Sequence, residues 1–421
     1  MVDQSMEQMV RQMRRGLERT PLSRRGFMWA SAMSASAAFL AACSSGGGAS
    51  SAPSAAASEA ASTAPSEAAS VEPSQALESL GPEPSFVVPP NIESELFMYN
   101  WGDYVDPNNM KLFQDVYGVK KFTYDVFSNN DEMMAKFQGG ATGQWDICCP
   151  TMNYLPAMRD QGFLSKLDKS LIPNLKYVDA AFKGKYWDPT DEYSAPKDWG
   201  TTGITVRTKD VKEPVTTWRE FLDLIPKYSG KVVFVDSADD VFIAPLKANG
   251  YSLNSDVKEE LDKAREELLK VAPHLLALDS DQYNTKIETE EAVLGLTWTG
   301  GILELRDKPK TADVVYTIPA DGTVFWLDTW VVLADPPHPI AANAWINFIH
   351  EPHIQAIETE TNRYATPDSA AKQFIDPKLL ADPALFVADD VVAKLEPQKD
   401  NSGIQQRQDI WAEFKSKIGQ G

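Results

Sequence analysis

The composition of the chain changes sharply near residue 91, and this change decides which part of it can fold. Residues 44–91 consist mostly of Ser, Ala, Gly, Pro and Glu and contain a single Phe. Such a segment buries too little apolar surface to offset the entropy of ordering it. We therefore expect a disordered tether there, although a glycosylated stalk would have the same composition. The remainder, residues 92–421, is long enough for about two ordinary α/β domains.

A segment near the start of the chain has the features of an export signal. Residues 23–28 contain paired arginines and precede a weakly apolar run that is too short to span a membrane as a stable helix. This arrangement resembles a twin-arginine signal, the alternative being a chance Arg-Arg pair before an Ala/Ser-rich helix. Residues 40–43, Leu-Ala-Ala-Cys, resemble a lipobox, in which the Cys is diacylated and becomes the mature N-terminus. We expect a signal peptide at 1–42, lipidation at Cys43, a tether at 43–91 and anchoring to the outer face of the cytoplasmic membrane.

The formal net charge of −20 at pH 7 restricts the partners of the chain. A strongly acidic protein repels nucleic acid and favours cationic partners, although solubility alone explains the charge equally well. After Cys43 the sequence contains no run of about 20 apolar residues that could form a second membrane anchor.

Three cysteines are too few for a disulfide scaffold. With Cys43 assigned to lipid, Cys148 and Cys149 remain. They are adjacent in a predicted strand, where alternation sends their side chains to opposite faces, and a vicinal disulfide would be strained. We expect two buried free thiols.

From residue 95 onwards, predicted strands alternate with predicted helices. Strands are expected at residues 95–99, 121–126, 145–149, 231–235, 292–298, 314–318 and 324–333. Helices are expected at residues 107–116, 131–137, 239–248, 255–271, 339–349, 352–359 and 409–418. This order implies parallel pairing with right-handed crossovers, and hence an α/β fold.

Motifs for catalysis are weak or missing. His350 and His353 have His-x-x-His spacing, but Pro352 interrupts a helix between them and no Cys or third His lies near. No nucleophile elbow, Walker loop or dinucleotide fingerprint follows a predicted strand. We therefore expect no catalytic residues, no metal and no cofactor.

Aromatic residues beside carboxylates recur where predicted strands run into loops. In open α/β sheets, ligands bind at the carboxyl ends of the strands. An ammonium group over an aromatic ring gains about 0.5–2 kcal/mol, and a carboxylate fixes the position of its nitrogen. The pattern therefore predicts an organic cation with methylenes between its charges. The instances are Trp101-Gly102-Asp103-Tyr104, Trp298, Phe325-Trp326-Leu327-Asp328 and Arg363-Tyr364, with further carboxylates between Asp236 and Asp240.

Any single Trp is more often part of a core than of a ligand site. The case for Trp101, Trp298 and Trp326 rests on their position at strand ends beside polar loops. The other tryptophans considered are assigned to the core: Trp145, Trp187, Trp218, Trp330, Trp345 and Trp411.

Seven collinear segments resemble the spermidine/putrescine-binding proteins of ABC importers, and together they extend over nearly the whole folded part. They are residues 96–105, 128–136, 198–204, 215–218, 295–298, 325–328 and 364–367. The resemblance implies a type II periplasmic-binding-protein-like fold, in which two α/β lobes are joined by crossing strands and a ligand is clamped in the cleft between them. Lobe 1 is expected at residues 92–200 plus 328–371, and lobe 2 at residues 201–327 plus 372–421.

The resemblance also implies a set of ligand contacts. The aromatic box carries over to Trp101, Tyr104, Trp298, Trp326 and Tyr364. Asp328 matches the carboxylate that grips an inner amine. The remaining matches are Asp240, which is one methylene shorter than the usual Glu, Asp103 and Gln398.

Some positions depart from the pattern of the family. Ser237 stands where the spermidine binders have an Asp, and Thr151 and Asn153 stand where they have Ser and Tyr. Gly301 stands where putrescine-type binders often have an Asp. Fewer acidic partners favour a diamine slightly over a triamine, unless Asp236 or Asp239 supplies a replacement.

The resemblance implies a monomeric receptor that captures putrescine or spermidine and presents it to an ABC permease, with no enzyme activity and no nucleic acid partner. Three alternatives remain open at this point. The same fold could bind another cationic amine or an amino-acid derivative. The chain could be a surface hydrolase, or a sensor or scaffold that takes no part in transport.

Overall fold

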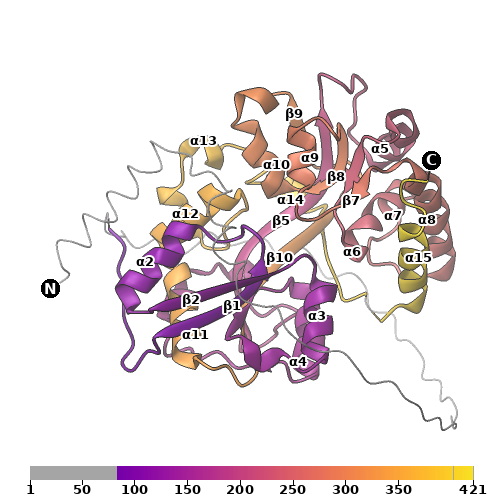
Figure 1. Cartoon of the computed structure of the whole chain (residues 1–421). Coiled ribbons are helices and arrows are strands. Elements are labelled where there is room, and N and C mark those ends of the chain that lie inside the picture. The colour runs from indigo at the N-terminus through magenta and orange to yellow at the C-terminus, as the bar shows by residue number, and fades with distance from the viewer. Residues whose placement is uncertain (1–82, 402, 421) are drawn as a thin grey trace, which may run out of the picture. The chain divides into compact units, whose positions relative to one another are not determined.

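The computed structural model describes residues 83–401 and 403–420 of the chain (Figure 1). The predicted signal peptide, the predicted lipidation site Cys43 and the predicted tether as far as residue 82 lie outside the described residues.

Part of the segment predicted to be a tether packs against the folded part of the chain. The sequence predicts a tether through residue 91, whereas Phe86 already packs against Phe348 and Tyr117, with ring centroids 5.4 and 6.4 Å apart. Contact between aromatic rings buries apolar surface, and this outweighs the local bias of the surrounding Pro and Ser residues towards disorder.

A hydrogen-bonded sheet forms the centre of the described part of the chain. Its strands are β1 (Glu95–Trp101), β2 (Lys121–Phe127), β3 (Ile147–Cys148), β4 (Leu164–Ser165), β5 (Ser194–Arg207), β6 (Val232–Phe234), β7 (Ala277–Leu278), β8 (Leu294–Trp298), β9 (Val314–Thr317), β10 (Val324–Leu333) and β11 (Glu396–Pro397). They pair in the order β2-β1-β3-β10-β5-β8-β6-β7, with β4 and β11 on β10 and β9 on β5. β1 pairs in parallel with β2 and β3, and β6 with β7 and β8, which confirms the predicted parallel units.

β5 and β10 connect the two parallel units and run through the middle of Figure 1. They pair with each other in antiparallel fashion. The end of β10 continues onto β3 and β4, whereas the end of β5 continues onto β8 and β9. The expected lobe boundaries, 200/201 and 327/328, fall inside these two strands. The division into lobes stays a prediction.

Most of β5 escapes sequence-based prediction, because Pro196, Gly200 and Gly203 are poor strand formers. The strand forms because its neighbours β8, β9 and β10 supply hydrogen bonds on both edges.

Helices pack beside the sheet in both regions of Figure 1. They are α2 (Pro107–Tyr117), α3 (Asn130–Gln138), α4 (Leu155–Asp160), α5 (Trp218–Leu224), α6 (Ala238–Val241), α7 (Ile243–Ala248), α8 (Lys258–Val271), α9 (Tyr283–Glu288), α10 (Thr299–Arg306), α11 (Pro339–Ile349), α12 (Pro352–Asn362), α13 (Pro377–Leu380), α14 (Asp389–Val392) and α15 (Gln405–Lys415). In the described ranges, none of them is long and apolar enough to cross a membrane.

Local sequence explains where helices begin and end. α2 begins at Asp106, whose carboxylate accepts a hydrogen bond from the backbone N–H of Asn108 at 2.7 Å. It ends at Gly118, whose φ of 75° lies in the left-handed region that glycine adopts without steric cost. α5 begins with a reciprocal capping box between Thr217 and Glu220.

Three predicted helices differ from the structure in their continuity or by at least three residues at their start. The helix expected at 239–248 is split into α6 and α7, because Pro245 has no N–H to bond the carbonyl of Val241. The helix expected from residue 255 begins at Lys258, so Val257 is exposed rather than part of the apolar face. The helix expected at 409–418 spans Gln405–Lys415, because its buried face includes a polar residue, Arg407.

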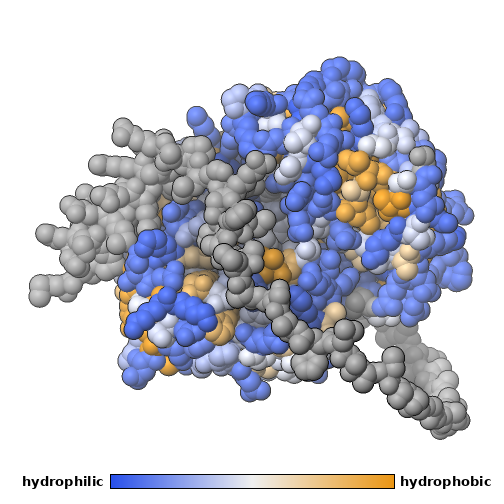
Figure 2. Space-filling view, in the orientation of Figure 1, coloured by the Kyte–Doolittle hydropathy of each residue, from blue (hydrophilic) through white to orange (hydrophobic). Residues whose placement is uncertain are grey.

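The core contains the expected side chains, with one exception among the tryptophans. Cys148 and Cys149 are buried free thiols, as predicted, and burial raises the pKa of both. Trp411 is only half-buried and lines a cavity. The tryptophans that are buried as expected are Trp145, Trp187, Trp218, Trp330 and Trp345. Figure 2 shows that the visible surface is mostly hydrophilic, with small and separate apolar patches.

Candidate ligand-binding site

The five aromatic side chains predicted to form a box lie in two contacting groups near the β5–β10 pair. Tyr364 contacts Tyr104 and Trp326 edge-on, with ring centroids 5.7 and 5.0 Å apart. Trp101 contacts Trp298 edge-on at 5.8 Å. The rings come from the loop after β1, the ends of β1 and β8, the start of β10 and the loop after α12. The fold therefore brings together residues that are far apart in the sequence.

Tyr283, at the start of α9, links the two groups and was missed by sequence reasoning. Its ring lies edge-on to Trp298 at 5.9 Å, and its hydroxyl shares a hydrogen bond with Tyr364. Burial raises the pKa of both phenols, so both are neutral at pH 7. The preceding residues are rich in Asp and Ser and indicate only a loop, so no local signal marks this residue.

Glycines allow the rings to approach the backbone. A Cβ on Gly200 would lie 2.5 Å from the ring of Trp326, and a Cβ on Gly300 would lie 2.5 Å from the ring of Tyr364. A Cβ on Gly301 would lie 2.3 Å from the hydroxyl of Tyr283. Gly301 is therefore a steric requirement of this packing, and an acidic side chain could not be added there without moving the tyrosine.

Asp328 lies at a bulge in β10 and is 6% exposed. The Thr151 hydroxyl donates a hydrogen bond to Oδ1 of Asp328 at 2.7 Å, and the Tyr104 hydroxyl lies 2.6 Å from Oδ2. Burial, with the nearby charge of Asp198 as the second cause, raises the pKa of Asp328 to about 7. A ligand ammonium at this position would stabilise the ionised carboxylate.

Asp198 and Lys197 add two buried charges that the sequence analysis did not single out. The strand register places Asp198 directly opposite Asp328. The Tyr104 hydroxyl is 2.5 Å from Asp198, and the Lys197 ammonium is 2.5 Å from the other oxygen of the same carboxylate. The ammonium also lies 3.5 Å from the centroid of the Tyr104 ring. A charged pair in the middle of a strand has no periodic signature, which explains why it was missed.

Asp240 provides a second buried carboxylate beside the Trp101–Trp298 group. It accepts hydrogen bonds from the Thr202 hydroxyl at 2.5 Å and from the indole N–H of Trp298 at 3.2 Å. Its pKa is raised, mainly by burial. Ser237 is the N-cap of α6 and accepts a hydrogen bond from the backbone N–H of Asp240. Ser237 therefore positions this carboxylate.

The remaining predicted residues lie in different surroundings. Asn153 is buried and donates to Asp239 at 3.0 Å. Gln398 is buried next to β11, and its backbone N–H donates to the carbonyl of Phe325 at 3.1 Å. Asp103 is exposed on the turn after β1, with a φ of 53°. Its carboxylate is therefore not part of the buried group around Asp328.

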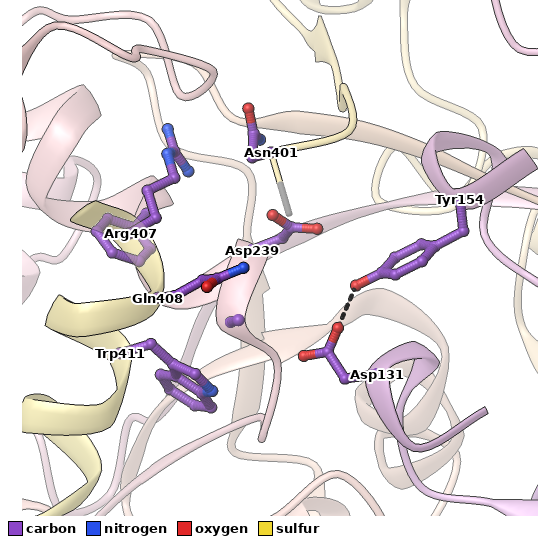
Figure 3. A pocket seen from close by; sticks show the side chains of 9 residues that line it. Asp131, Tyr154, Asp239, Asn401, Arg407, Gln408 and Trp411 are labelled. Carbon is purple, nitrogen blue, oxygen red and sulfur yellow. Dashed lines mark hydrogen bonds between the residues drawn. The ribbon is translucent and has the colours of Figure 1, made fainter. Parts of the chain in front are cut away.

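A cavity of about 260 Å³ adjoins this region (Figure 3). Asp131 and Tyr154, joined by a hydrogen bond of 3.0 Å, lie on one side, and residues of α6 and α15 lie on the other. Burial raises the pKa of Asp239 to about 7, while the charge of Arg407 opposes the shift. The lining residues are Asp131, Tyr154, Ala238, Asp239, Phe242, Asn401, Arg407, Gln408 and Trp411.

The chemistry of the arrangement favours binding of a cation. Three buried carboxyls, those of Asp198, Asp240 and Asp328, stand beside aromatic rings, and Lys197 contacts one of them. The imidazoles of His350 and His353 bond to separate carboxylates, Asp368 and Glu351. Over residues 83–401 and 403–420, no group of His, Cys, Asp and Glu side chains is arranged to hold a metal ion.

Comparison with known proteins shows the family. A family model described as bacterial extracellular solute-binding protein matches residues 110–387. The chain is 31% identical over 328 residues to the spermidine/putrescine-binding periplasmic protein of Escherichia coli, and the match covers 77% of this chain and 92% of that protein. It is 29% identical over 324 residues to the putrescine/agmatine-binding protein of Pseudomonas aeruginosa, covering 72% and 87%.

The fold agrees with these relationships. The crystal structure of the spermidine/putrescine substrate-binding protein PotD from Streptococcus pneumoniae matches with a TM-score of 0.65 at 27% identity. The match covers 77% of this chain and 99% of that chain. Sequence and structure thus agree over most of the described residues. The chain belongs to the family of bacterial extracellular solute-binding proteins.

Proposed function

We propose that this protein captures a polyamine, putrescine or spermidine, and delivers it to an ABC permease in the membrane. The family binds solutes outside the cytoplasm, so the protein is a binding protein and not an enzyme. The observation that carries the proposal is the buried Asp328 carboxyl beside the contacting rings of Tyr104, Tyr364 and Trp326. Relatives named for spermidine and putrescine binding support the same ligand class.

The site residues divide into two ends that suit an alkylamine with charges at its ends. Asp328 stands beside the Tyr104, Tyr364 and Trp326 rings, and Asp240 stands beside the Trp101–Trp298 pair. Rings contribute about 0.5–2 kcal/mol for each cation, and more when the cation is desolvated. Methylenes of the ligand pack on the rings while each ammonium group approaches an oxygen.

Lobe closure is the proposed mechanism. Ligand contacts to both lobes stabilise the closed state, and the ligand shifts the equilibrium only by its difference in affinity for the two states. Two polar contacts already join residues of the expected lobes: Ser128 donates to Asp281 at 3.1 Å, and Asn153 donates to Asp239 at 3.0 Å.

Another cationic amine is the second candidate ligand. The Pseudomonas aeruginosa relative is named for agmatine as well as putrescine, and agmatine carries a guanidinium group at one end. A guanidinium makes a paired hydrogen bond with a carboxylate. Asp328 and Asp240 could accept such a group as readily as an ammonium.

Titration calorimetry of the purified protein tests the proposal. The ligands are putrescine, spermidine, agmatine and 1,4-butanediol, which is the uncharged counterpart of putrescine. We expect micromolar or tighter binding of at least one amine and no measurable binding of the diol. If no amine binds up to millimolar concentration, the proposed function is wrong.

The export route and the anchor belong to the same proposal. The leader sequence supports delivery through twin-arginine export followed by lipidation of Cys43. The protein is proposed to function as a monomer. Arg24→Lys together with Arg25→Lys should block export. Cys43→Ser should release the protein from the membrane fraction. Unchanged surface delivery or unchanged membrane association would contradict the corresponding step.

A further inference from the structure

Lys197 and Asp198 form a buried ion pair opposite Asp328 in the β5–β10 pair. Their side chains are 1% and 6% exposed. Burial alone lowers the pKa of Lys197, but the charges of Asp198 and Glu358 outweigh burial and raise it. Lys197 is therefore a cation at neutral pH. A buried charged pair that replaces apolar residues often costs stability, so a role other than stability needs consideration.

The Lys197 ammonium already makes the two contacts that the site offers to an amine. It lies 2.5 Å from the Asp198 carboxylate and 3.5 Å from the centroid of the Tyr104 ring. These are a carboxylate contact and a cation–π contact, the same interactions proposed for the ligand. One face of Tyr104 and the carboxylate of Asp198 are therefore occupied by the protein itself.

The hydrogen bonds of Tyr104 indicate which carboxyl carries a proton when no ligand is bound. The Tyr104 hydroxyl carries one proton and lies within hydrogen-bond distance of both Asp198 and Asp328. One hydroxyl proton makes a linear hydrogen bond to only one of the two carboxyls, so a proton on the other carboxyl would satisfy the second short contact. Asp328, whose pKa is about 7, holds it, and its O–H then donates to the Tyr104 oxygen. The Lys197 ammonium contacts the other oxygen of Asp198 at 2.5 Å.

We propose that the Lys197–Asp198 pair determines the charge of the ligand: by supplying a cation of its own, it leaves only the carboxyls of Asp328 and Asp240 to be balanced, so the site selects a diamine over a triamine. This inference rests on the proposed function and narrows its ligand class. Asp239 lines the adjoining cavity, where Asn153 donates a hydrogen bond to it at 3.0 Å and the positive charge of Arg407 favours its ionised form.

Proton release accompanies the binding of the amine. Below about pH 7, the ligand ammonium replaces the proton of Asp328, and the proton leaves to solvent. Glu358 faces Lys197 from α12 and accepts hydrogen bonds from the Asn109 and Asn362 amides. The other charged or titratable groups that face Asp328 come from four elements or loops: Tyr104, Cys149, Asp198 with Lys197, and Tyr364.

The experiment compares putrescine with spermidine by calorimetry in wild type and three variants. Wild type should prefer putrescine. Lys197→Met leaves three carboxylates without a resident cation and should shift the ratio of the two dissociation constants towards spermidine by about tenfold or more. Asp198→Asn leaves an unpaired ammonium and should weaken both amines by about tenfold or more. The double variant Lys197→Met/Asp198→Asn again leaves two carboxylates, so the preference for putrescine should return.

A matched control and a second readout separate this inference from a structural effect. Lys258→Met removes an exposed lysine that pairs with Asp262 on α8, and it should leave the ratio unchanged. Calorimetry in two buffers of different ionisation enthalpy should show release of about one proton per putrescine at pH 6 and far less at pH 8.

The outcomes distinguish the two proposals. Absence of amine binding in wild type overturns the proposed function. Amine binding in wild type with a preference for spermidine, or an unchanged ratio in Lys197→Met, overturns the role of the ion pair and leaves the proposed function standing. If Lys197→Met does not fold, the double variant decides: loss of the preference for putrescine in that folded variant also overturns the inference.

Discussion

At the scale of single residues, the buried carboxyls of the candidate site differ in their partners. Asp328 interacts with two hydroxyls, Asp240 with a hydroxyl and an indole N–H, and Asp198 with a hydroxyl and an ammonium. Hydrogen bonds and opposite charges favour the ionised carboxylate, whereas burial favours the neutral acid. The balance leaves Asp328 near its titration point at neutral pH. A ligand ammonium needs only a modest interaction to change its charge.

Asp328→Asn tests the role of the Asp328 carboxyl in amine binding. We expect a loss of about 2–4 kcal/mol in the binding free energy of putrescine, because a buried counter-charge is removed while the shape of the side chain is kept. Titration calorimetry measures the loss. Asp160→Asn, with a side chain that is 71% exposed at the end of α4, is the control and should bind normally. Affinity of Asp328→Asn within about threefold of wild type would show that the ammonium binds elsewhere.

Substitutions of two tryptophans should have different effects, one on ligand binding and the other on protein stability. Trp326→Ala should weaken amine binding by about 1–3 kcal/mol, because it removes a ring that contacts Tyr364 beside the carboxyl. Trp187→Ala should mainly lower the free energy of unfolding by about 3–5 kcal/mol, because Trp187 packs in the core and not against the ligand. Calorimetry and urea unfolding on both variants give the comparison. If both substitutions weakened amine binding equally, the assignment of Trp326 to the ligand site and of Trp187 to the core would be wrong.

At the scale of secondary structure, the antiparallel pair of β5 and β10 positions the site. Its register sets Trp326 opposite Gly200 and Asp328 opposite Asp198. The bulge after Asp328 changes the direction in which the following side chains point. The same two strands link the parallel units, so any change in their register would displace the site and the connection together.

Gly200→Ala tests this packing. The added Cβ would meet the ring of Trp326 at 2.5 Å, so the ring or the strand must shift. We expect a stability loss of about 1–3 kcal/mol together with weaker amine binding. Gly403→Ala is the control, because a Cβ there meets nothing within 4 Å. Urea unfolding and calorimetry provide the readouts, and a fully stable variant with normal binding would show that the close approach is not required.

At the scale of the whole described unit, buried acids couple stability to pH. Burial raises the pKa of Asp239, Asp328 and Glu358 to about 7, far above the ordinary range of carboxyls near 4. Between these two values the folded state holds protons that the unfolded state has released. The free energy of unfolding therefore falls as pH rises from about 4 to about 7, by about 1.4 kcal/mol per pH unit for each such proton.

Urea unfolding at pH 5 and pH 7 without ligand checks this dependence. Wild type should be more stable at pH 5, and Asp328→Asn should lose less stability between the two values, because one of the three protons is no longer involved. The exposed control Asp160→Asn should follow wild type. Equal pH dependence in wild type and Asp328→Asn would mean that Asp328 is ionised in the unliganded fold.

Local pattern was enough to predict much of the architecture. Alternating strand and helix signals indicated the two parallel units, and the adjacent cysteines in an apolar run indicated buried thiols. Both properties follow from nearest neighbours along the chain, so the amino-acid sequence determines them almost directly. Trp298, Trp326 and Asp328 were named from their position at strand ends and from a resemblance, and the fold brings them close to other members of the site.

Tertiary structure alone decided the parts that depend on contacts between distant segments. The Tyr104 hydroxyl reaches Asp328 across 224 positions of sequence, and β5 is a strand because neighbouring strands pair with it, in spite of its Pro and Gly residues. Lys197 and Tyr283 likewise reach the candidate site only through contacts between distant segments. The periodicity of a sequence indicates which face of a helix or strand is buried. The charge and shape of a site depend on which buried faces contact one another, and only the packing of the whole chain determines these contacts.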